Sequence, residues 1–134
     1  MGQLLFNNLL VAADGFGLPL PNRGLAFGDG FFETLIFTQG QLRLAADHFA
    51  RMQQAAAALY LTLPTELASP EALETTLARL AGANHLAARL RLQLWRAGGG
   101  LLHAGQVASS VAQAASSENQ GFKKAVAEGQ ATVG

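Results

Sequence analysis

Residues 88–96, with the sequence ARLRLQLWR, alternate between polar and apolar side chains along most of their length. Leu90, Leu92 and Leu94 occupy every second position, and charged or amide side chains lie between them. Because successive side chains of a β-strand point to opposite faces of its sheet, this pattern predicts a strand with one apolar and one polar face. The fold must therefore supply a second layer that covers the leucines.

Two segments have the periodicity of helices and could form that layer. Residues 45–61 carry an apolar stripe at steps of three and four residues, formed by Phe49, Met52, Ala56 and Leu59. Residues 69–81 begin with Ser-Pro-Glu, which combines a hydroxyl cap, a proline in the first turn and an acid near the positive end of the helix. Gly82 is suited to end this second helix, so we expect two main helices.

Short apolar runs interrupted by turn residues predict the remaining strands. An Asn-Asn pair would close a hairpin within residues 3–12, and a Gln-Gly pair would close another within residues 31–44. Residues 107–111 and 122–127 are two further candidate strands, and the small polar residues 112–120 are typical of a connection. The order of strands, two helices and strands predicts an α+β fold with a mixed or antiparallel sheet.

Composition excludes several classes of function. Of the 134 residues, 50% are hydrophobic and 13% are charged, which is enough apolar material for a core. Nine basic side chains balance nine acidic ones, so a nucleic-acid partner is not expected, because neutralising phosphates needs a basic surface. The chain has no cysteine, which excludes disulfides, thiolate zinc sites and cysteine nucleophiles, and we expect no metal site. Its start lacks the pattern of a signal peptide and no apolar run reaches the roughly 20 residues that span a bilayer, so we expect a cytoplasmic protein without a membrane partner.

Residues 22–34, with the sequence NRGLAFGDGFFET, hold the most specific pattern in the chain. An Arg-Gly pair leads into Gly-Asp-Gly, after which two aromatic residues and Glu-Thr begin a strand. This segment closely resembles the N-terminal signature of the class IV aminotransferase and aminodeoxychorismate lyase family, the pyridoxal-phosphate enzymes of fold type IV. A Gly-Asp-Gly turn alone would indicate only a tight turn before a strand. The resemblance implies the N-terminal domain of that family in residues 1–115, and a connection with the start of a C-terminal domain in residues 116–134.

His48 and Arg51 extend the resemblance, because family members carry a histidine, two variable residues, an arginine and an apolar residue at the start of the first helix. The family's arginine at this place binds the phosphate of pyridoxal phosphate, which implies that Arg51 is the cofactor-binding residue. A phosphate dianion favours such a forked, permanently charged donor. The alternative is a solvated Arg51 that pairs with Asp47, four residues earlier in the helix. We assign His48 no catalytic role.

Three residues are implied as substrate contacts. Phe32 stands where family enzymes that act on D-amino acids have a tyrosine, and Phe32-Glu33-Thr34 is more similar to the lyase and branched-chain types. Arg96 ends the alternating strand before a glycine-rich loop, as an arginine does in the family, and would contact the substrate or support its site. The alternative is an exposed arginine at the end of an edge strand. His103 lies in the following loop, although the loop arginine of several relatives is absent there.

No catalytic residue is assigned within the chain, because the lysine that holds the cofactor as a Schiff base is expected beyond Gly134. Lys123 and Lys124 lack the helix start that follows the family's lysine, and we interpret them as exposed chain. The resemblance covers nearly the whole chain and about the first half of the family's length. It implies pyridoxal 5′-phosphate as cofactor, a small amino-acid-type substrate and a homodimer.

The complete protein would then be an aminotransferase or a lyase. The sequence Phe32-Glu33-Thr34 and the glycine-rich loop after Arg96 favour the aminodeoxychorismate lyase branch slightly, with the branched-chain aminotransferases close behind. A hypothesis from a different class remains open, in which the chain is a non-catalytic α+β interaction or binding module that lacks the lysine.

Overall fold

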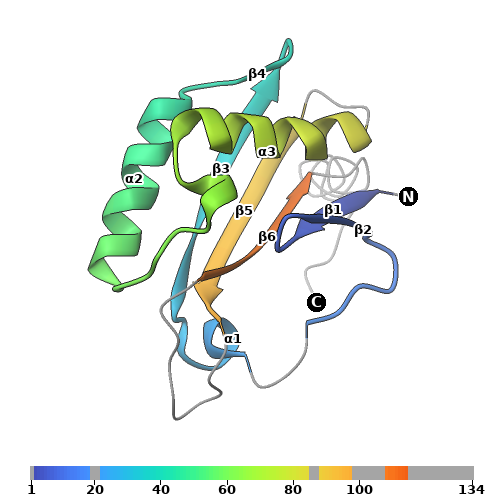
Figure 1. Cartoon of the computed structure of the whole chain (residues 1–134). Coiled ribbons are helices and arrows are strands. Elements are labelled where there is room, and N and C mark those ends of the chain that lie inside the picture. The colour runs from blue at the N-terminus through green and yellow to red at the C-terminus, as the bar shows by residue number, and fades with distance from the viewer. Residues whose placement is uncertain (1, 19–21, 85–87, 98–107, 115–134) are drawn as a thin grey trace, which may run out of the picture.

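The computed structural model describes residues 2–18, 22–84, 88–97 and 108–114. These residues form a six-stranded sheet with helices on one of its faces (Figure 1). The strands lie in the order β2-β1-β6-β5-β3-β4, and every neighbouring pair is antiparallel. Their bounds are β1 Gln3–Phe6, β2 Leu9–Ala12, β3 Gly30–Thr38, β4 Gln41–Leu42, β5 Ala88–Arg96 and β6 Ala108–Ala114. The predicted α+β fold is therefore confirmed, and the sheet is antiparallel.

The alternating strand β5 lies inside the sheet, between β6 and β3. Leu90, Leu92 and Leu94 are at most 1% exposed and belong to the hydrophobic core. Arg89 and Arg91 are exposed, on the other face of the strand. The alternation therefore predicted both the strand and its buried face, and burial of each leucine stabilises the fold by about 1.5–3 kcal/mol.

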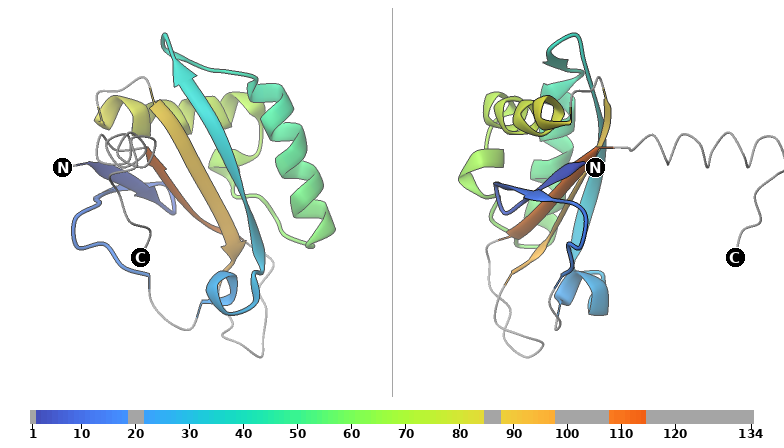
Figure 2. Two further views of the ribbon diagram at one scale, coloured as in Figure 1. Left: turned by 180° about the vertical axis from the view of Figure 1, so that it is seen from behind. Right: turned by 90° about the vertical axis from the view of Figure 1, so that its right-hand side faces the viewer.

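The helices have the bounds α1 Arg23–Phe27, α2 Ala45–Ala58 and α3 Pro70–Ala83, with a short 3₁₀ helix, η1 Thr65–Leu67, before α3. Residues of α2, η1 and α3 belong to the same core as the leucines of β5. Figure 2 shows α2 and α3 on one face of the sheet, whereas α1 lies at the end of the sheet. The stripe of α2 buries Phe49, Met52 and Ala56 as predicted, but the helix ends at Ala58 instead of residue 61. The chain turns away two residues later at Tyr60, whose φ of 56° is not helical.

The third helix begins as predicted but ends later. The Ser69 hydroxyl accepts a hydrogen bond from the N–H of Ala72 at 3.0 Å, which caps the first turn. The expectation that Gly82 ends this helix was wrong, because α3 continues through Gly82 to Ala83. The side chain of Asn84 supplies the end instead, by donating from Nδ2 to the carbonyl of Leu80 at 2.8 Å.

Both predicted hairpins are present. Asn7 and Asn8, with φ of 47° and 69°, turn β1 into β2, and the pair at positions 39 and 40 turns β3 into β4. The strand expected at residues 107–111 is β6, which runs further, to Ala114. Residues 112–114 were expected in a connection, but all three pair with β5, and Ala112 and Gln113 also pair with β1. The strand expected at residues 122–127 lies outside the described residues.

The sheet face opposite the helices carries a row of exposed side chains. On β3, Phe32 and Ile36 are 58% and 43% exposed, because they alternate with the core residues Leu35 and Phe37. Towards β1, the rings of Phe6 and Trp95 stack on this face. No helix in the described part of the chain has the length and apolar character needed to cross a membrane.

Candidate functional site

Two polar clusters lie where β3 begins, and they contain Arg51 and Arg96, two of the residues singled out by the sequence. The Asp29 cluster consists of Arg23, Asp29 and Arg96. The Glu33 cluster consists of Glu33, His48 and Arg51. Both are built on the Gly-Asp-Gly-Phe-Phe-Glu segment, so the motif that carries the family resemblance also positions the polar groups.

In the Asp29 cluster, one carboxylate oxygen holds two arginines. Asp29 Oδ2 accepts from Nε of Arg23 at 2.9 Å and from Nε of Arg96 at 3.0 Å. The hydrogen bond from Arg23 lowers the pKa of Asp29 and burial opposes this effect, but the hydrogen bond from Arg96 and the charges of both arginines lower it further, so the pKa lies below its ordinary value. Asp29 is therefore the ionised centre that joins α1 to the end of β5.

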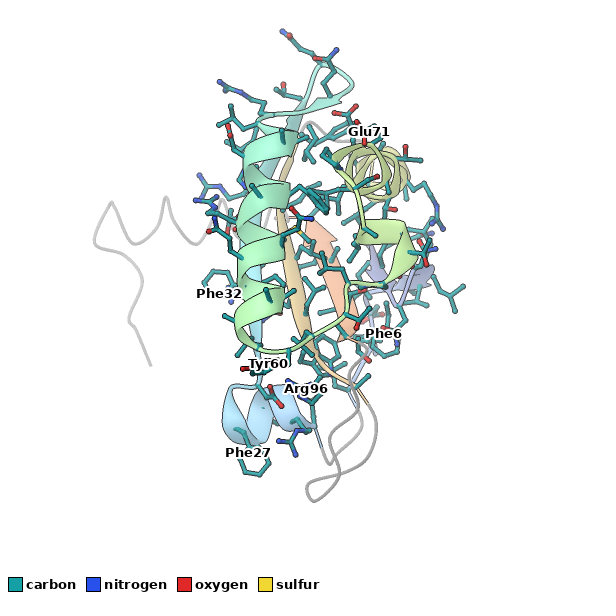
Figure 3. The ribbon with its side chains drawn as sticks, turned by 60° about the vertical axis from the view of Figure 1, so that its left-hand side comes forward. Phe6, Phe27, Phe32, Tyr60, Glu71 and Arg96 are labelled. Atoms are coloured by element: carbon teal, nitrogen blue, oxygen red, sulfur yellow. The ribbon has the colours of Figure 1, made fainter. Side chains whose placement is uncertain are left out.

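Arg96 is bound on several sides within this cluster. Its backbone N–H donates to the carbonyl of Asp29 at 3.0 Å. Its guanidinium also donates to the carbonyls of Leu59 and Tyr60, which follow the last turn of α2. Figure 3 shows Arg96 between α1 and the end of α2, with Phe32 projecting from β3. This arrangement suits the supporting role of Arg96, because its side chain is only 12% exposed.

The glycines of the motif let the chain segments approach closely. A Cβ at Gly30 would lie 2.1 Å from the carbonyl oxygen of Leu94, and one at Gly24 would lie 2.7 Å from Cβ of Trp95. Gly28 has a φ of 63° and ends α1, which starts with a cap from the Asn22 side chain to the N–H of Leu25. Larger residues at Gly24 or Gly30 would push α1 and β3 away from β5.

The Glu33 cluster joins β3 to α2. Glu33 Oε2 lies 2.9 Å from Nδ1 of His48 and 2.9 Å from Nη2 of Arg51. Arg51 thus forms its ion pair with Glu33 on the neighbouring strand, and the alternative of a pair with Asp47 in its own helix is not found among the described residues. The side chains of Glu33 and His48 are 10% and 12% exposed, whereas that of Arg51 is 64% exposed. Arg51 is therefore a surface cation attached to a buried carboxylate.

Sequence reasoning did not find this role of Glu33, although a signal was present. Glu33 falls in the alternation of β3 at a core-facing position, in line with Leu35 and Phe37. A carboxylate among apolar side chains needs partners, because an unpaired buried charge is costly. That one polar exception in an apolar row could have indicated a partner from the covering helix.

Phe32 lies on the opposite face of β3 from Glu33. The guanidinium of Arg91 covers its ring at 4.5 Å from the ring centre, an attractive cation–π geometry. Beside Phe32 the surface is hollowed between α1 and the ends of β3 and β5, with Gly28, Gln93 and Trp95 among the lining residues. Phe32 thus borders a recess, and Arg96 anchors the same end of the sheet. His103 lies outside the described residues.

The sequence as a whole also matches a known family. The chain belongs to the class IV aminotransferases, because the model for amino-transferase class IV matches residues 30–128. The match includes both β3, with its Glu33, and the His48 and Arg51 pair of α2. No curated protein matches the chain.

Among solved structures, the chain is similar to three aminotransferases. It is 20% identical to the branched-chain aminotransferase of Thermoproteus uzoniensis, covering 85% of this chain and 40% of that one with a TM-score of 0.70. It is 16% identical to the branched-chain amino acid aminotransferase of Escherichia coli, covering 85% of this chain and 40% of that one with a TM-score of 0.70. It is 21% identical to a hypothetical aminotransferase from Mycobacterium tuberculosis in its pyridoxal-phosphate-bound form, covering 85% of this chain and 39% of that one with a TM-score of 0.62.

The chain spans about two fifths of the length of these structures. At these identities the likeness establishes the fold, which is that of the N-terminal domain of the fold type IV pyridoxal-phosphate enzymes. The expectations of the family and of its N-terminal fold are therefore confirmed.

Proposed function

We propose that the complete protein is a pyridoxal-phosphate-dependent enzyme that acts on the amino group of an amino-acid-type substrate. The match of residues 30–128 to the class IV aminotransferases is the observation that carries this proposal. In this proposal residues 1–115 form the N-terminal domain, and residues 116–134 lead into a second domain that holds the cofactor-binding lysine. The active unit is a homodimer.

Arg51 suits the cofactor's phosphate group. One of its five N–H donors is directed to Glu33 Oε2, and no bond from Nε or Nη1 is recorded within the described residues. A forked cation that is attached through one nitrogen, on a side chain that is 64% exposed, matches the oxygens of a phosphate group. The residues present therefore fit the cofactor that the family implies.

The cofactor, when bound, stabilises negative charge that develops on the substrate carbon next to the amino group. The chain contributes binding and shape around that chemistry. Arg51 would hold the phosphate, Phe32 would limit water and shape the substrate recess, and the Asp29 cluster with Arg96 would hold the wall of that recess in place. His103 is proposed as a further substrate contact.

Amino transfer is favoured over elimination within this proposal. The similar solved structures named above are aminotransferases, two of them specific by name for branched-chain amino acids. A lyase of the aminodeoxychorismate type remains the second candidate, supported by the sequence Phe32-Glu33-Thr34 and the glycine-rich loop after Arg96. The two activities are distinguished by whether the purified complete protein needs a 2-oxo acid as co-substrate.

The cofactor role of Arg51 is tested by titrating the complete protein with pyridoxal 5′-phosphate and following the absorbance of the bound cofactor. Arg51→Ala should raise the dissociation constant at least tenfold, because a charge-assisted hydrogen bond contributes about 1.5–3 kcal/mol. Arg43→Ala is the matched control, because Arg43 is an exposed arginine next to the same helix. Equal affinity in Arg51→Ala and the unmodified protein would refute the phosphate role.

A non-catalytic interaction module is the alternative from a different class. Its support is the exposure of Leu25, Phe27 and Tyr60, which are 75%, 58% and 83% exposed near one end of the molecule. Such apolar side chains suit contact with another domain or protein. Turnover of an amino acid by the complete protein with bound cofactor would exclude this alternative.

A further inference from the structure

The buried carboxylate of Glu33 accepts a hydrogen bond from the guanidinium of Arg51. We propose that Glu33 is a positioning residue, which fixes the guanidinium of Arg51 so that its remaining donors face a phosphate group. This inference rests on the proposed cofactor role of Arg51 and assigns a function to a residue that does not itself contact the cofactor.

The fold alone does not require a carboxylate at position 33. Glu33 occupies a core-facing position of β3, and the next two residues in that row are Leu35 and Phe37, which belong to the core. An apolar side chain at position 33 would continue the row without burying a charge. A buried ion pair is often no more stabilising than apolar packing of the same volume. The carboxylate therefore indicates a function beyond stability.

The geometry of the Glu33 cluster decides which of its atoms donate. Glu33 Oε2, His48 Nδ1 and Arg51 Nη2 form a triangle with sides of 2.9, 2.9 and 3.0 Å. Both nitrogens can donate to the carboxylate at once only when Nδ1 carries the hydrogen of the imidazole. The 3.0 Å contact between the nitrogens then joins two donors and is not a hydrogen bond. His48 thus helps to hold the oxygen to which Arg51 is attached.

The Glu33 cluster extends from the buried side of β3 to the surface of α2. Exposure rises from 10% for the Glu33 side chain to 64% for that of Arg51. The attachment point is therefore fixed by packing, while most of the Arg51 side chain is exposed. A long arginine side chain loses rotational freedom when it binds a ligand, and a side chain that is already ordered loses less. Glu33 would raise the affinity for phosphate in this way.

The same carboxylate also has an opposite electrostatic effect. Its negative charge partly neutralises Arg51 and should weaken the attraction for an anion. Positioning and neutralisation therefore predict changes of opposite sign when Glu33 is replaced. Positioning predicts weaker binding of the cofactor, and neutralisation predicts tighter binding.

The test compares pyridoxal 5′-phosphate with pyridoxal, which lacks the phosphate, by absorbance titration of the complete protein. Glu33→Leu, which continues the apolar row, should raise the dissociation constant for pyridoxal 5′-phosphate roughly tenfold, as loss of an outer hydrogen-bond partner does for other ligand-binding side chains. Affinity for pyridoxal should be unchanged. Glu33→Gln should give an intermediate value, because its amide oxygen can still accept. In Arg51→Ala, the added Glu33→Leu change should have no further effect.

The control is Glu74→Gln. Glu74 also accepts a hydrogen bond, in its case from the backbone N–H of Leu42, but it takes no part in the Glu33 cluster, so its replacement should leave both affinities unchanged. Tighter or unchanged binding of pyridoxal 5′-phosphate in Glu33→Leu overturns the inference, and so does an equal loss for pyridoxal, which would show a general structural effect. If Arg51→Ala has normal affinity, the phosphate role itself fails; if Arg51→Ala is weakened and Glu33→Leu is not, only the role of Glu33 fails.

Discussion

Asp29 determines the position of two arginines that come from distant parts of the chain. Arg23 lies six residues before it and Arg96 lies 67 residues after it, and both donate from Nε to the same oxygen. The Arg96 guanidinium continues to the carbonyls after α2, so this one carboxylate connects α1, β5 and α2. Charge-assisted bonds to a carboxylate are roughly twice as strong as neutral ones, which makes the cluster a rigid end for the sheet.

Asp29→Ala should destabilise the protein by about 1–3 kcal/mol at pH 7, because it leaves two arginines without their shared acceptor. The pKa of folded Asp29 lies below its ordinary value of 3.8, so its contribution is fully present above that pH and is lost as the pH falls through the folded pKa. Urea denaturation should therefore show a large difference between the two proteins at pH 7 and a smaller one at a pH well below 3.8. Asp14→Ala, in an exposed turn, should change stability by less than about 0.5 kcal/mol at either pH. A difference that is the same at both pH values would contradict the role of the ionised carboxylate.

The strands and the two main helices follow from local patterns, whereas the polar clusters do not. The alternation of β5 and the stripe of α2 each repeat over several residues, so the sequence was enough to predict them. The single turn of α1 was not predicted, although Asn22 and Gly28 are ordinary residues for its two ends. The partnership of Glu33 with Arg51 depends on how α2 packs on β3, and no local pattern specifies that packing. The cofactor-binding role of Arg51 was predicted from the resemblance to the family motif, not from a local pattern.

Replacing two glycines tests the packing of these elements. Gly30→Ala should destabilise the protein by about 1–3 kcal/mol or more, because the new Cβ would lie 2.1 Å from the backbone oxygen of Leu94 and force β3 away from β5. Gly82→Ala should stabilise it by about 0.5–1 kcal/mol, because nothing lies within 4 Å of the new Cβ and alanine favours the helix. Thermal unfolding of both variants gives the comparison. Gly30→Ala with normal stability would mean that the close contact of β3 with β5 is not needed.

The described residues share one hydrophobic core between the sheet and the helices. Leu77 of α3, Leu35 of β3 and Leu92 of β5 are at most 1% exposed and belong to the same cluster. A single core of this kind favours unfolding as one cooperative unit. Trp95, the chain's one tryptophan, sits in β5, so its fluorescence reports on the sheet while circular dichroism is dominated by the helices.

Leu77→Ala should therefore lower the urea midpoint of the fluorescence transition and that of the circular dichroism transition together. The cavity that it leaves should lower the free energy of unfolding by about 2–5 kcal/mol. Because the sheet and the helices share one core, both should lose this stability. Leu25→Ala, at a leucine that is 75% exposed, should shift neither signal by more than about 0.5 kcal/mol. If the dichroism midpoint fell in Leu77→Ala while the fluorescence midpoint stayed in place, the helices and the sheet would be separate units. Coincident shifts would mean that the sheet and the helices unfold together. The Glu33 cluster, which joins α2 to β3, would then stay intact for as long as the whole domain is folded.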